Sequence, residues 1–486
     1  MTEKSRRKWA LVALCLAFFV VQLDVTVVNV GLQTIRHELG GGLGGQQWVV
    51  ASYTLALAAG MLTAGALGDR FGARRLCVTG LVVFAIGSAL CAFAPTMPML
   101  IAARLVQGVG AAALLPCSLA LIVLRCEDPR ERAHALGLWG GISSIGLATG
   151  PVVGGLLIAV STWRAIFLVN VPVCAVAIVL IRMFALESPR RREQRMDCLG
   201  LVFGTVALAS VTGGLIEAGQ RGWGKPVPLT LILGGLAIGA AFVLLERRRT
   251  DPMLPMRIFA SRPFSAATAA GGIFNFNLYG TLLCVSLFLQ GPLGRSAFAA
   301  GLLILPLTVA VGIGAMLSGR LTARFGPRPP MLIGYGLGAV GGALLAFVGP
   351  HGPLPLLVAG STIVGFCSIS MPAMTSVVMA AADRSLTGLA SGVLNTARQG
   401  GGAFGTAVLG TLLTVADGSA AMLLRVPMLV VVAAYFVAIG CTILSTGSGS
   451  VSVSGSGSGN AHTSAAPEPP HDLRSKPYER LSIHRP

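Results

Sequence analysis

Residues 9–31 read WALVALCLAFFVVQLDVTVVNVG, and this stretch decides the class of fold. It holds a single charged side chain, Asp24, in an otherwise apolar or neutral run. An α-helix needs roughly 20 mostly apolar residues to cross the hydrocarbon core of a bilayer. The basic residues within 4–8 resemble the start of a signal peptide, but the run is too long and lacks a small-residue cleavage site. We therefore predict an uncleaved membrane-spanning helix.

The same pattern recurs along all 486 residues, of which 54% are apolar and 11% are charged, with a mean hydropathy of +0.78. A soluble domain carries about 25% charged residues. This composition excludes a soluble enzyme, a disordered regulator and a nucleic-acid-binding protein as descriptions of the whole chain. About fourteen apolar segments are long enough to span a bilayer, near residues 9–31, 46–67, 76–95, 98–121, 135–158, 165–185, 198–217, 228–246, 264–289, 298–318, 330–348, 354–379, 390–414 and 424–444.

The placement of the basic residues predicts the orientation. With an even number of spans, both termini lie on one side, and placing them in the cytoplasm puts 28 of the 36 Lys and Arg residues in inner loops and termini. Six lie in outer loops, and two, Arg104 and Arg398, lie within spans. This asymmetry follows the positive-inside rule. The net charge of +18 is therefore explained by topology, and we expect no nucleic-acid partner.

Two long basic inner stretches, 186–197 and 247–263, enclose two of the spans. We therefore expect an all-α integral membrane protein with fourteen transmembrane helices, built from two pseudo-symmetric six-helix bundles and a two-helix insert. The expected parts are a cytoplasmic N-terminus (1–8), an N-terminal bundle (9–185), the insert with its basic linkers (186–262), a C-terminal bundle (263–445) and a Ser/Gly-rich, disordered cytoplasmic tail (446–486).

An internal repeat supports two related bundles. GALGDRFGARRLCVTG (65–80) and GRLTARFGPRPPMLIG (319–334) agree at seven of sixteen positions. Both stretches are expected inner loops that lead into a new helix. A six-helix unit used twice, with sites between the halves, is an architecture of many secondary transporters.

Four motifs resemble those of a known family: LDVTVVNV (23–30), GALGDRFGARR (65–75), RLVQGVGAA (104–112) and GLATGPVVGG (146–155). In this order the chain resembles the major facilitator superfamily, in its fourteen-helix drug:proton antiporter branch, and is similar to actinobacterial exporters of the methylenomycin resistance type. The resemblance covers about residues 9–445. It implies a multi-pass protein of the cell membrane that exports amphipathic, drug-like molecules in exchange for protons.

The loop 65–75 suits a tight turn, because glycine permits unusual backbone dihedral angles. Its candidate residues are Gly65, Gly72, Asp69, Arg70 and Arg74. Asp69 can accept hydrogen bonds from a helix start and can pair with the two arginines. The resemblance implies a cytoplasmic latch between the halves, and the alternative is a basic loop that only sets topology. The second copy has Ala323 in place of Asp69, so any latch belongs to the first half.

Glycines in the fifth expected helix form a smooth stripe at positions i, i+4 and i+8, and Pro151 can kink the span. In the family this pattern distinguishes antiporters from symporters. Ordinary packing of small residues is the alternative. The residues concerned are Gly146, Gly150, Pro151, Gly154 and Gly155.

Of the 18 acidic residues, only Asp24 lies well inside a span, while Glu217 lies at the outer edge of another. An apolar medium favours the neutral form of a carboxyl group, so Asp24 could load and release a proton as its access to water alternates. The resemblance implies that Arg104 modulates this proton carrier. The alternatives are a structural ion pair and a snorkelling arginine. Whether Asp24 faces a cavity or packs against the helix of Arg104 stays open at this level.

The candidates for a substrate cavity are polar residues in apolar or aromatic segments, a combination that suits amphipathic small molecules. Hydrogen bonds between helices are the alternative, and Arg398 could equally stabilise its own helix. The candidates are Gln107, Asn275, Asn277, Tyr279, Asn395, Arg398 and Gln399.

Motifs of soluble catalysis are absent from the sequence, including GxxxxGK[ST], HExxH and GxSxG, and the ten cysteines form no CxxC pair. We therefore expect no enzyme activity, no metal site and no cofactor, and a monomer driven by the proton gradient. The alternatives are a proton-coupled symporter for a polar metabolite and a membrane receptor that transports nothing.

Overall fold

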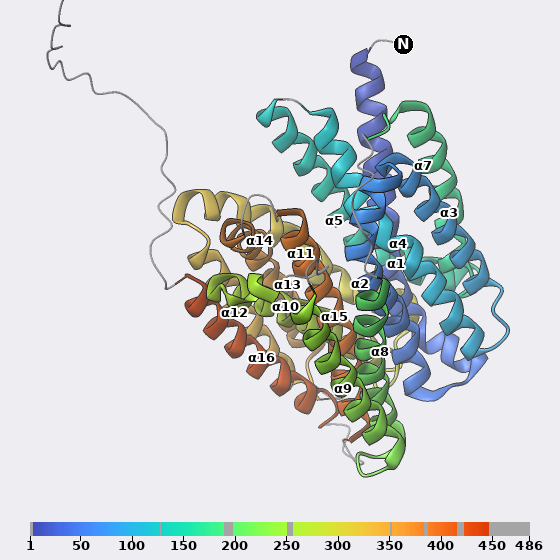
Figure 1. Ribbon diagram of the computed structural model, residues 1–486. Helices are drawn as coiled ribbons and strands as arrows, with labels where there is room; N and C mark the ends of the chain where they lie inside the picture. Colours follow the sequence, from blue (N-terminus) through green and yellow to red (C-terminus); the bar gives the residue numbers. More distant parts are fainter. Residues whose placement is uncertain are drawn as a thin grey trace, which may run out of the picture. The chain divides into compact units, whose positions relative to one another are not determined.

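The computed structural model describes residues 3–126, 128–188, 198–249, 256–349, 352–382, 387–415 and 422–446. Within these ranges the regular structure is entirely helical, and all of it belongs to one compact unit, Met1–Ser448 (Figure 1). The first helices are α1 (Glu3–Leu39), α2 (Gly42–Phe71), α3 (Ala73–Ala92), α4 (Met97–Arg125), α5 (Pro129–Val160), α6 (Ala165–Leu168) and α7 (Asn170–Phe184). The remaining helices are α8 (Cys198–Arg221), α9 (Pro226–Arg248), η1 (Met256–Ala260), α10 (Arg262–Gln290), α11 (Ala297–Phe325), α12 (Arg328–Ala346), α13 (Leu354–Gly365), η2 (Phe366–Ile369), α14 (Ser370–Ala381), α15 (Thr387–Val415) and α16 (Met422–Thr446).

Twelve segments of the described chain are long and apolar enough to cross a membrane. Two of them combine consecutive helices, namely Ala165–Phe184 (α6 and α7) and Leu354–Ala381 (α13, η2 and α14). The 29-residue α15 is not among the twelve, although it is a long helix. The side chains of residues 62, 66 and 69 in the 30-residue α2 lie outside the described residues, so the count of twelve does not cover this helix as a whole. The chain is therefore an all-helical, multi-pass membrane protein.

Many large apolar side chains lie on the exterior of this unit, including Val160, Met316 and Phe347, each more than 70% exposed. Such a surface is unfavourable in water but suits contact with lipid. Nine cysteines have described side chains; they are free, and all except the half-buried Cys441 are buried, as expected for small apolar side chains.

The internal repeat has the same backbone geometry in both copies. Gly72 follows α2 with φ of 100°, and Gly326 follows α11 with φ of 76°. Positive φ is readily accessible to glycine and strained for other residues. In each copy the arginine before the last phenylalanine lies over its ring, with Arg70 5.3 Å from the centroid of Phe71 and Arg324 5.1 Å from that of Phe325.

Helix packing also repeats. The pairs α1–α5, α2–α4, α3–α4, α3–α7 and α1–α7 have counterparts in α10–α15, α11–α13, α12–α13, α12–α16 and α10–α16. The contacts between these two groups of helices are likewise reciprocal, because α5 packs against α11 and α2 packs against α15. We refer to α1–α7 as the N-terminal half and to α10–α16 as the C-terminal half.

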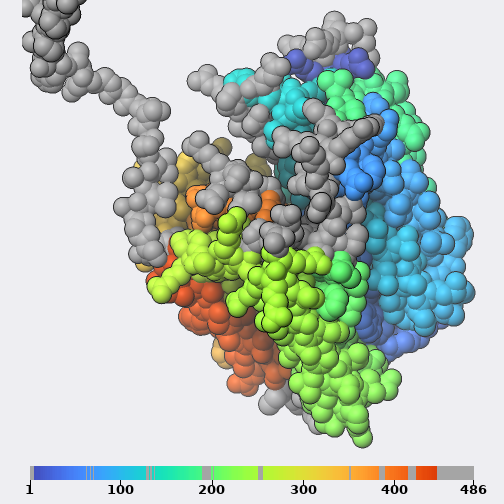
Figure 2. Space-filling model, in the orientation of Figure 1, coloured from blue at the N-terminus to red at the C-terminus, as the bar shows by residue number. Residues whose placement is uncertain are grey.

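Helices α8 and α9 pack against each other, and α8 also contacts one helix of each half, α2 and α15. Gly213 of α8 allows this approach on one side, since a Cβ atom there would lie 2.9 Å from the Trp48 ring. On the other side, Thr411 of α15 donates to the carbonyl of Leu215 at 3.0 Å. On the face drawn in Figure 2, the green residues of α8 and α9 lie between the blue N-terminal helices and the red α16.

Candidate functional site

A buried ion pair joins α1 to α4. The Nη1 atom of Arg104 donates to the Oδ2 atom of Asp24 at 2.5 Å, and both side chains are at most 1% exposed. Removing two charges from water is costly unless they are paired and satisfied by further hydrogen bonds. The structure thus answers the open question of orientation, because Asp24 packs against the helix of Arg104.

Three neutral side chains complete the hydrogen bonds of this pair. Gln107 donates to Asp24 Oδ1 at 2.8 Å and accepts from Arg104 at 2.6 Å. Asn170 of α7 donates to the same Oδ1 atom at 2.9 Å. Ser88 of α3 accepts from Gln107 at 2.8 Å. Gln107, which the sequence suggests as a cavity residue, therefore lies within this polar cluster, which also contains Ser88 and Asn170.

Aromatic rings enclose the guanidinium group of Arg104. Its Cζ atom lies 4.1 Å from the ring centroid of Tyr53 and 5.9 Å from that of Phe167, and its Nε atom donates to the carbonyl of Val49 at 3.0 Å. Cation–π contacts are stronger where water is excluded. The cluster is therefore held by residues of α1, α2, α3, α4, α6 and α7, all in the N-terminal half.

The glycine stripe of α5 lies directly against α1. A Cβ atom on Gly146 would lie 2.8 Å from the carbonyl oxygen of Phe19, and one on Gly150 would lie 1.9 Å from Thr26 Oγ1. Gly154 meets Val27 in the same way, with 2.7 Å to its Cγ2 atom. The stripe thus faces the side of α1 that carries Thr26, while Asp24 faces α4.

The other two residues of this motif face the C-terminal half. A Cβ atom on Gly155 would lie 2.6 Å from the Cα atom of Phe298 in α11. Gly301 of α11 in turn comes so close that its Cβ atom would lie 2.2 Å from the carbonyl oxygen of Pro151. The motif therefore joins α1, which carries Asp24, to a helix of the other half.

In the loop after α2, the start of α3 is bound by residues that follow α7. Arg74 N–H donates to Glu187 Oε1 at 2.9 Å, Ala73 N–H donates to Ser188 Oγ at 2.8 Å, and the Arg74 side chain lies 3.7 Å from Glu187. A carboxylate at a helix N-terminus is favourable. Glu187, a residue that sequence reasoning did not identify, therefore accepts a hydrogen bond at the start of α3.

The other candidates of this loop are placed as follows. The Asp69 side chain lies outside the described residues, so its predicted pairing with Arg70 and Arg74 stays a prediction. Arg70 is exposed. Gly65 has open space where a Cβ atom would be. A Cβ atom on Gly72 would lie 2.5 Å from Glu187 Oε1.

The cavity candidates of α10 are buried deeply. Asn275 and Asn277 are 1% and 0% exposed, and neither side chain has a hydrogen-bond partner among the described residues. Tyr279 is 8% exposed and lies against α15, where a Cβ atom on Gly402 would be 2.5 Å from its ring. Unpaired buried amides are costly, and within the described residues neither side chain makes a hydrogen bond between helices.

The cavity candidates of α15 are only partly buried. The Asn395 side chain donates to the carbonyl of Ser391 at 3.0 Å and accepts from Arg398 at 3.5 Å. The Oε1 atom of Gln399 has no partner among the described residues. Arg398 has its guanidinium group 5.6 Å from the ring centroid of Phe274 in α10.

Hydrogen bonds join the halves at several depths, from the end of the bundle where α1 leads into α2 to the middle of α2, where the carbonyl of Ala58 accepts from Thr396 of α15 at 3.3 Å. Gln47 of α2 donates to the carbonyl of Ala407 in α15 at 2.8 Å. Ser286 of α10 donates to the carbonyl of Asn29 in α1 at 2.8 Å. Thr308 of α11 donates to the carbonyl of Ala148 in α5 at 3.1 Å.

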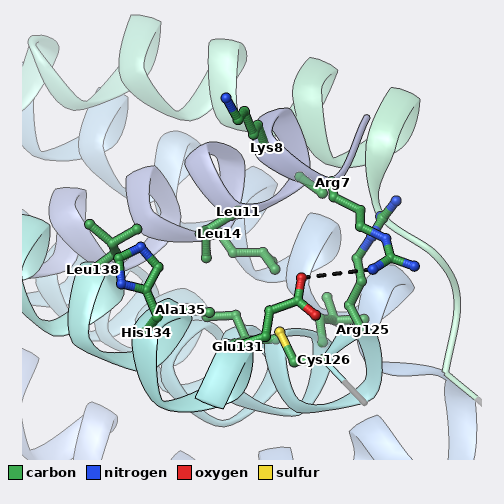
Figure 3. Close-up of a pocket in the computed structure, with 13 residues that line it drawn as sticks. Arg7, Lys8, Leu11, Leu14, Arg125, Cys126, Glu131, His134, Ala135 and Leu138 are labelled. Carbon is green, nitrogen blue, oxygen red and sulfur yellow. Dashed lines mark ion pairs between the residues drawn. The ribbon is translucent and has the colours of Figure 1, made fainter. Parts of the chain in front are cut away.

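A pocket of about 590 Å³ lies at the opposite end, between α1, α4 and α5. Figure 3 shows Arg7 and Glu131 pointing toward each other across it, with their charged groups 3.7 Å apart. Leu14, which also lines the pocket, precedes Asp24 by ten residues, about 15 Å of helix. The pocket is therefore separate from the ion pair. Among the described residues, no group of three His, Cys, Asp or Glu side chains could hold a metal ion.

The fold and the buried ion pair define a polytopic helical membrane protein with charges inside its spans, which is the character of an ion-coupled transporter. Comparison with known proteins identifies the family. The model of the Major Facilitator Superfamily matches residues 14–406 and 266–465, and the chain belongs to this superfamily.

Several relatives share much of the chain. The methylenomycin A resistance protein of Bacillus subtilis is 36% identical over 405 residues, which cover 83% of this chain and 87% of the relative. The multidrug resistance protein Stp of Mycobacterium tuberculosis is 37% identical over 83% of this chain and 75% of the relative. The puromycin resistance protein of Streptomyces alboniger is 36% identical over 84% of this chain and 82% of the relative.

Proposed function

We propose that this protein is a secondary-active exporter of amphipathic, drug-like molecules that exchanges them for protons. The observation that carries the proposal is the buried ion pair between Asp24 and Arg104. Asp24 is the one acidic residue that the sequence places well inside a span, and Arg104 belongs to a neighbouring helix. Family membership and relatives named for drug resistance support the direction of transport. The protein acts without a cofactor or an enzymatic step.

In this mechanism a proton and Arg104 compete for the same carboxylate. Protonation neutralises Asp24, and the arginine then loses the charge that holds it beside α1. Because an unpaired buried charge is strongly unfavourable, the arginine must move to other partners or to water. The helices that carry the pair would shift with it, and α5 would transmit the shift to α11 through its glycine and proline contacts.

The proposed topology has fourteen spans, in which α2 and α15 join the twelve apolar segments, and both termini are cytoplasmic. The helices α8 and α9 are then the two-helix insert between two six-helix bundles. In this orientation, the end that carries the Gln47–Ala407 and Ser286–Asn29 hydrogen bonds faces outward. We assign the described form to the state that is closed to the outside, in a monomer of the cell membrane.

The test measures proton release in proteoliposomes when N-phenyl-1-naphthylamine, a neutral amphipathic probe, is added. We expect the wild-type protein to release protons and Asp24→Asn to release none, while binding of the probe survives at least in part. Glu217→Gln is the matched control, because Glu217 lies at the edge of a span and pairs with Arg221 at 2.6 Å. If proton release persisted in Asp24→Asn and vanished in Glu217→Gln, the proton carrier would be Glu217 of α8 and not Asp24.

A further inference from the structure

The two halves each hold one arginine inside a span, but only one of them has a carboxylate partner. Arg104 pairs with Asp24 at 2.5 Å. Among the described residues no ion pair involves Arg398. Its polar contacts are two atoms at 3.5 Å, Asn395 Oδ1 and Met371 Sδ, and its Nε atom has no hydrogen-bond partner within the described chain.

The described residues of the C-terminal half include no Asp or Glu. Between Arg262 and Thr411 there is a single acidic residue, Asp383, which lies outside the described residues. Arg398 lies eleven residues after Thr387, where α15 begins, which is about 16 Å of helix. Asp24 is already held by Arg104, Gln107 and Asn170. The part of the chain that the structure describes therefore supplies no counter-charge to Arg398.

The surroundings of Arg398 favour an organic anion over an inorganic one. The ring of Phe274 and the thioether of Met371 lie against the guanidinium group, and Leu394 and Met374 lie beside the same region at Gly271. Arginine binds carboxylates and related oxyanions through its planar array of donors. One helical turn after Gly271, the side-chain amide of Asn275 is 1% exposed and has no hydrogen-bond partner among the described residues.

We propose that Arg398 binds the anionic group of the substrate, and that the exported molecules include amphipathic organic acids with a single negative charge. This inference rests on the proposed export function and names its substrate class. The apolar body of the acid lies against Phe274 and Met371. Arg398 lies near the middle of the 29-residue α15, and its side chain is partly exposed. The bound acid covers this exposed part of the side chain.

Two fluorescent probes with the same aromatic body test the proposal: 8-anilinonaphthalene-1-sulfonate, an anion, and N-phenyl-1-naphthylamine, which lacks the sulfonate. Binding is measured by fluorescence titration of the full-length protein in lipid nanodiscs. We expect Arg398→Gln to weaken binding of the sulfonate at least tenfold and to change binding of the neutral probe less than twofold. Arg398→Lys should keep part of the affinity for the sulfonate. Arg425→Gln, which removes an exposed arginine from α16, should change neither.

A second measurement needs no variant. On the wild-type protein, 1-naphthylacetate should displace the sulfonate probe, and 1-naphthylacetamide, its neutral amide, should not. Any of three results would overturn the proposal. The wild type and Arg398→Gln could bind the sulfonate with equal affinity, or Arg398→Gln could lose affinity for both probes to the same extent. In the third, 1-naphthylacetate and 1-naphthylacetamide would displace the sulfonate probe equally well. Proton-coupled export of the neutral probe by Arg398→Gln would leave the export function intact whichever way the anion result falls.

Discussion

At the scale of single residues, charge inside an apolar span was the signal that sequence could supply. Asp24 and Arg104 stand out because such side chains are rare in membrane helices. Their pairing could not be predicted, since it depends on how α1 packs beside α4. Ser88 and Asn170 gave no signal at all, because neutral polar side chains occur in many spans. Their role emerges only when α3 and α7 bring them to the carboxylate.

The position of Gln107 distinguishes proton coupling from substrate binding. Gln107→Leu removes the hydrogen bonds to Asp24 and Ser88 and leaves both groups short of a partner. We expect a loss of about 1–3 kcal/mol in stability, since buried polar groups lose their partners, and a changed pH profile of efflux for every substrate alike. Asn275→Leu is the matched comparison, because Asn275 has no partner to lose.

These expectations are checked by thermal unfolding and by drug-susceptibility profiles in a host that lacks its own pumps. Asn275→Leu should change susceptibility to some compounds and spare others. If Gln107→Leu also changed susceptibility to some compounds only and left the pH profile unchanged, Gln107 would be a substrate-binding residue and would not act in proton coupling.

At the scale of helices, spacing in the sequence predicted contact surfaces well but did not identify the partners. The glycine stripe of α5 was evident from its period of four residues, whereas its partner α1 was not. The turn at Gly72 was predicted from the glycines of the loop, and Gly326 in the second copy of the repeat also has a positive φ. The partner of that turn, Glu187, lies 115 positions further on, in a segment after a span, where nothing in the local pattern marks it.

The glycine stripe gives a prediction with a control on the same helix. Gly150→Ala places a methyl group 1.9 Å from Thr26 Oγ1 and 3.1 Å from the carbonyl oxygen of Leu23, so α1 must move away. Overpacking of this kind costs about 1–3 kcal/mol. We expect slower drug–proton exchange and a lower unfolding temperature, measured on purified protein and in proteoliposomes. Gly140→Ala, which meets nothing within 4 Å, should behave as wild type. Two variants with equal activity and stability would show that α1 and α5 need no close approach.

At the scale of the whole molecule, composition alone established a multi-pass helical membrane protein. The number of spans was harder to establish, because α15 falls outside the set of twelve apolar segments. In α15, glycine and polar residues replace apolar ones where the helix packs closely on α10. Gly401 and Gly405 approach the carbonyl oxygens of Gly272 and Phe276 so closely that Cβ atoms would lie 2.0 and 2.1 Å away. Close packing between helices thus weakens the hydropathy signal on which span counting depends.

The contacts between the halves give the last prediction, a cross-link that stops transport. A Cβ atom on Gly410 of α15 would lie 3.0 Å from Gln47 Cγ. The Cβ atom of Gln47 is one C–C bond, about 1.5 Å, from that Cγ atom. The two Cβ atoms are therefore at most about 4.5 Å apart. This range overlaps the Cβ–Cβ separations of disulfides, about 3.5–4.5 Å. The pair Gln47→Cys with Gly410→Cys should therefore oxidise readily, and replacing Gln47 also removes the side chain that a cysteine at 410 would meet.

Alternating access requires the halves to separate at this end, so the disulfide should block drug efflux and a reductant should restore it. Efflux is measured in proteoliposomes before oxidation, after oxidation and after reduction, and cross-linking is followed by mass spectrometry of peptides. The matched control joins α8 to α9 through Ala207→Cys and Gly239→Cys, whose Cβ atoms would be 3.7 Å apart. That disulfide lies within the pair α8–α9 and should leave efflux unchanged. Full efflux from a completely cross-linked 47–410 pair would mean that α2 and α15 stay together through the whole cycle, because the bond leaves them no freedom to part.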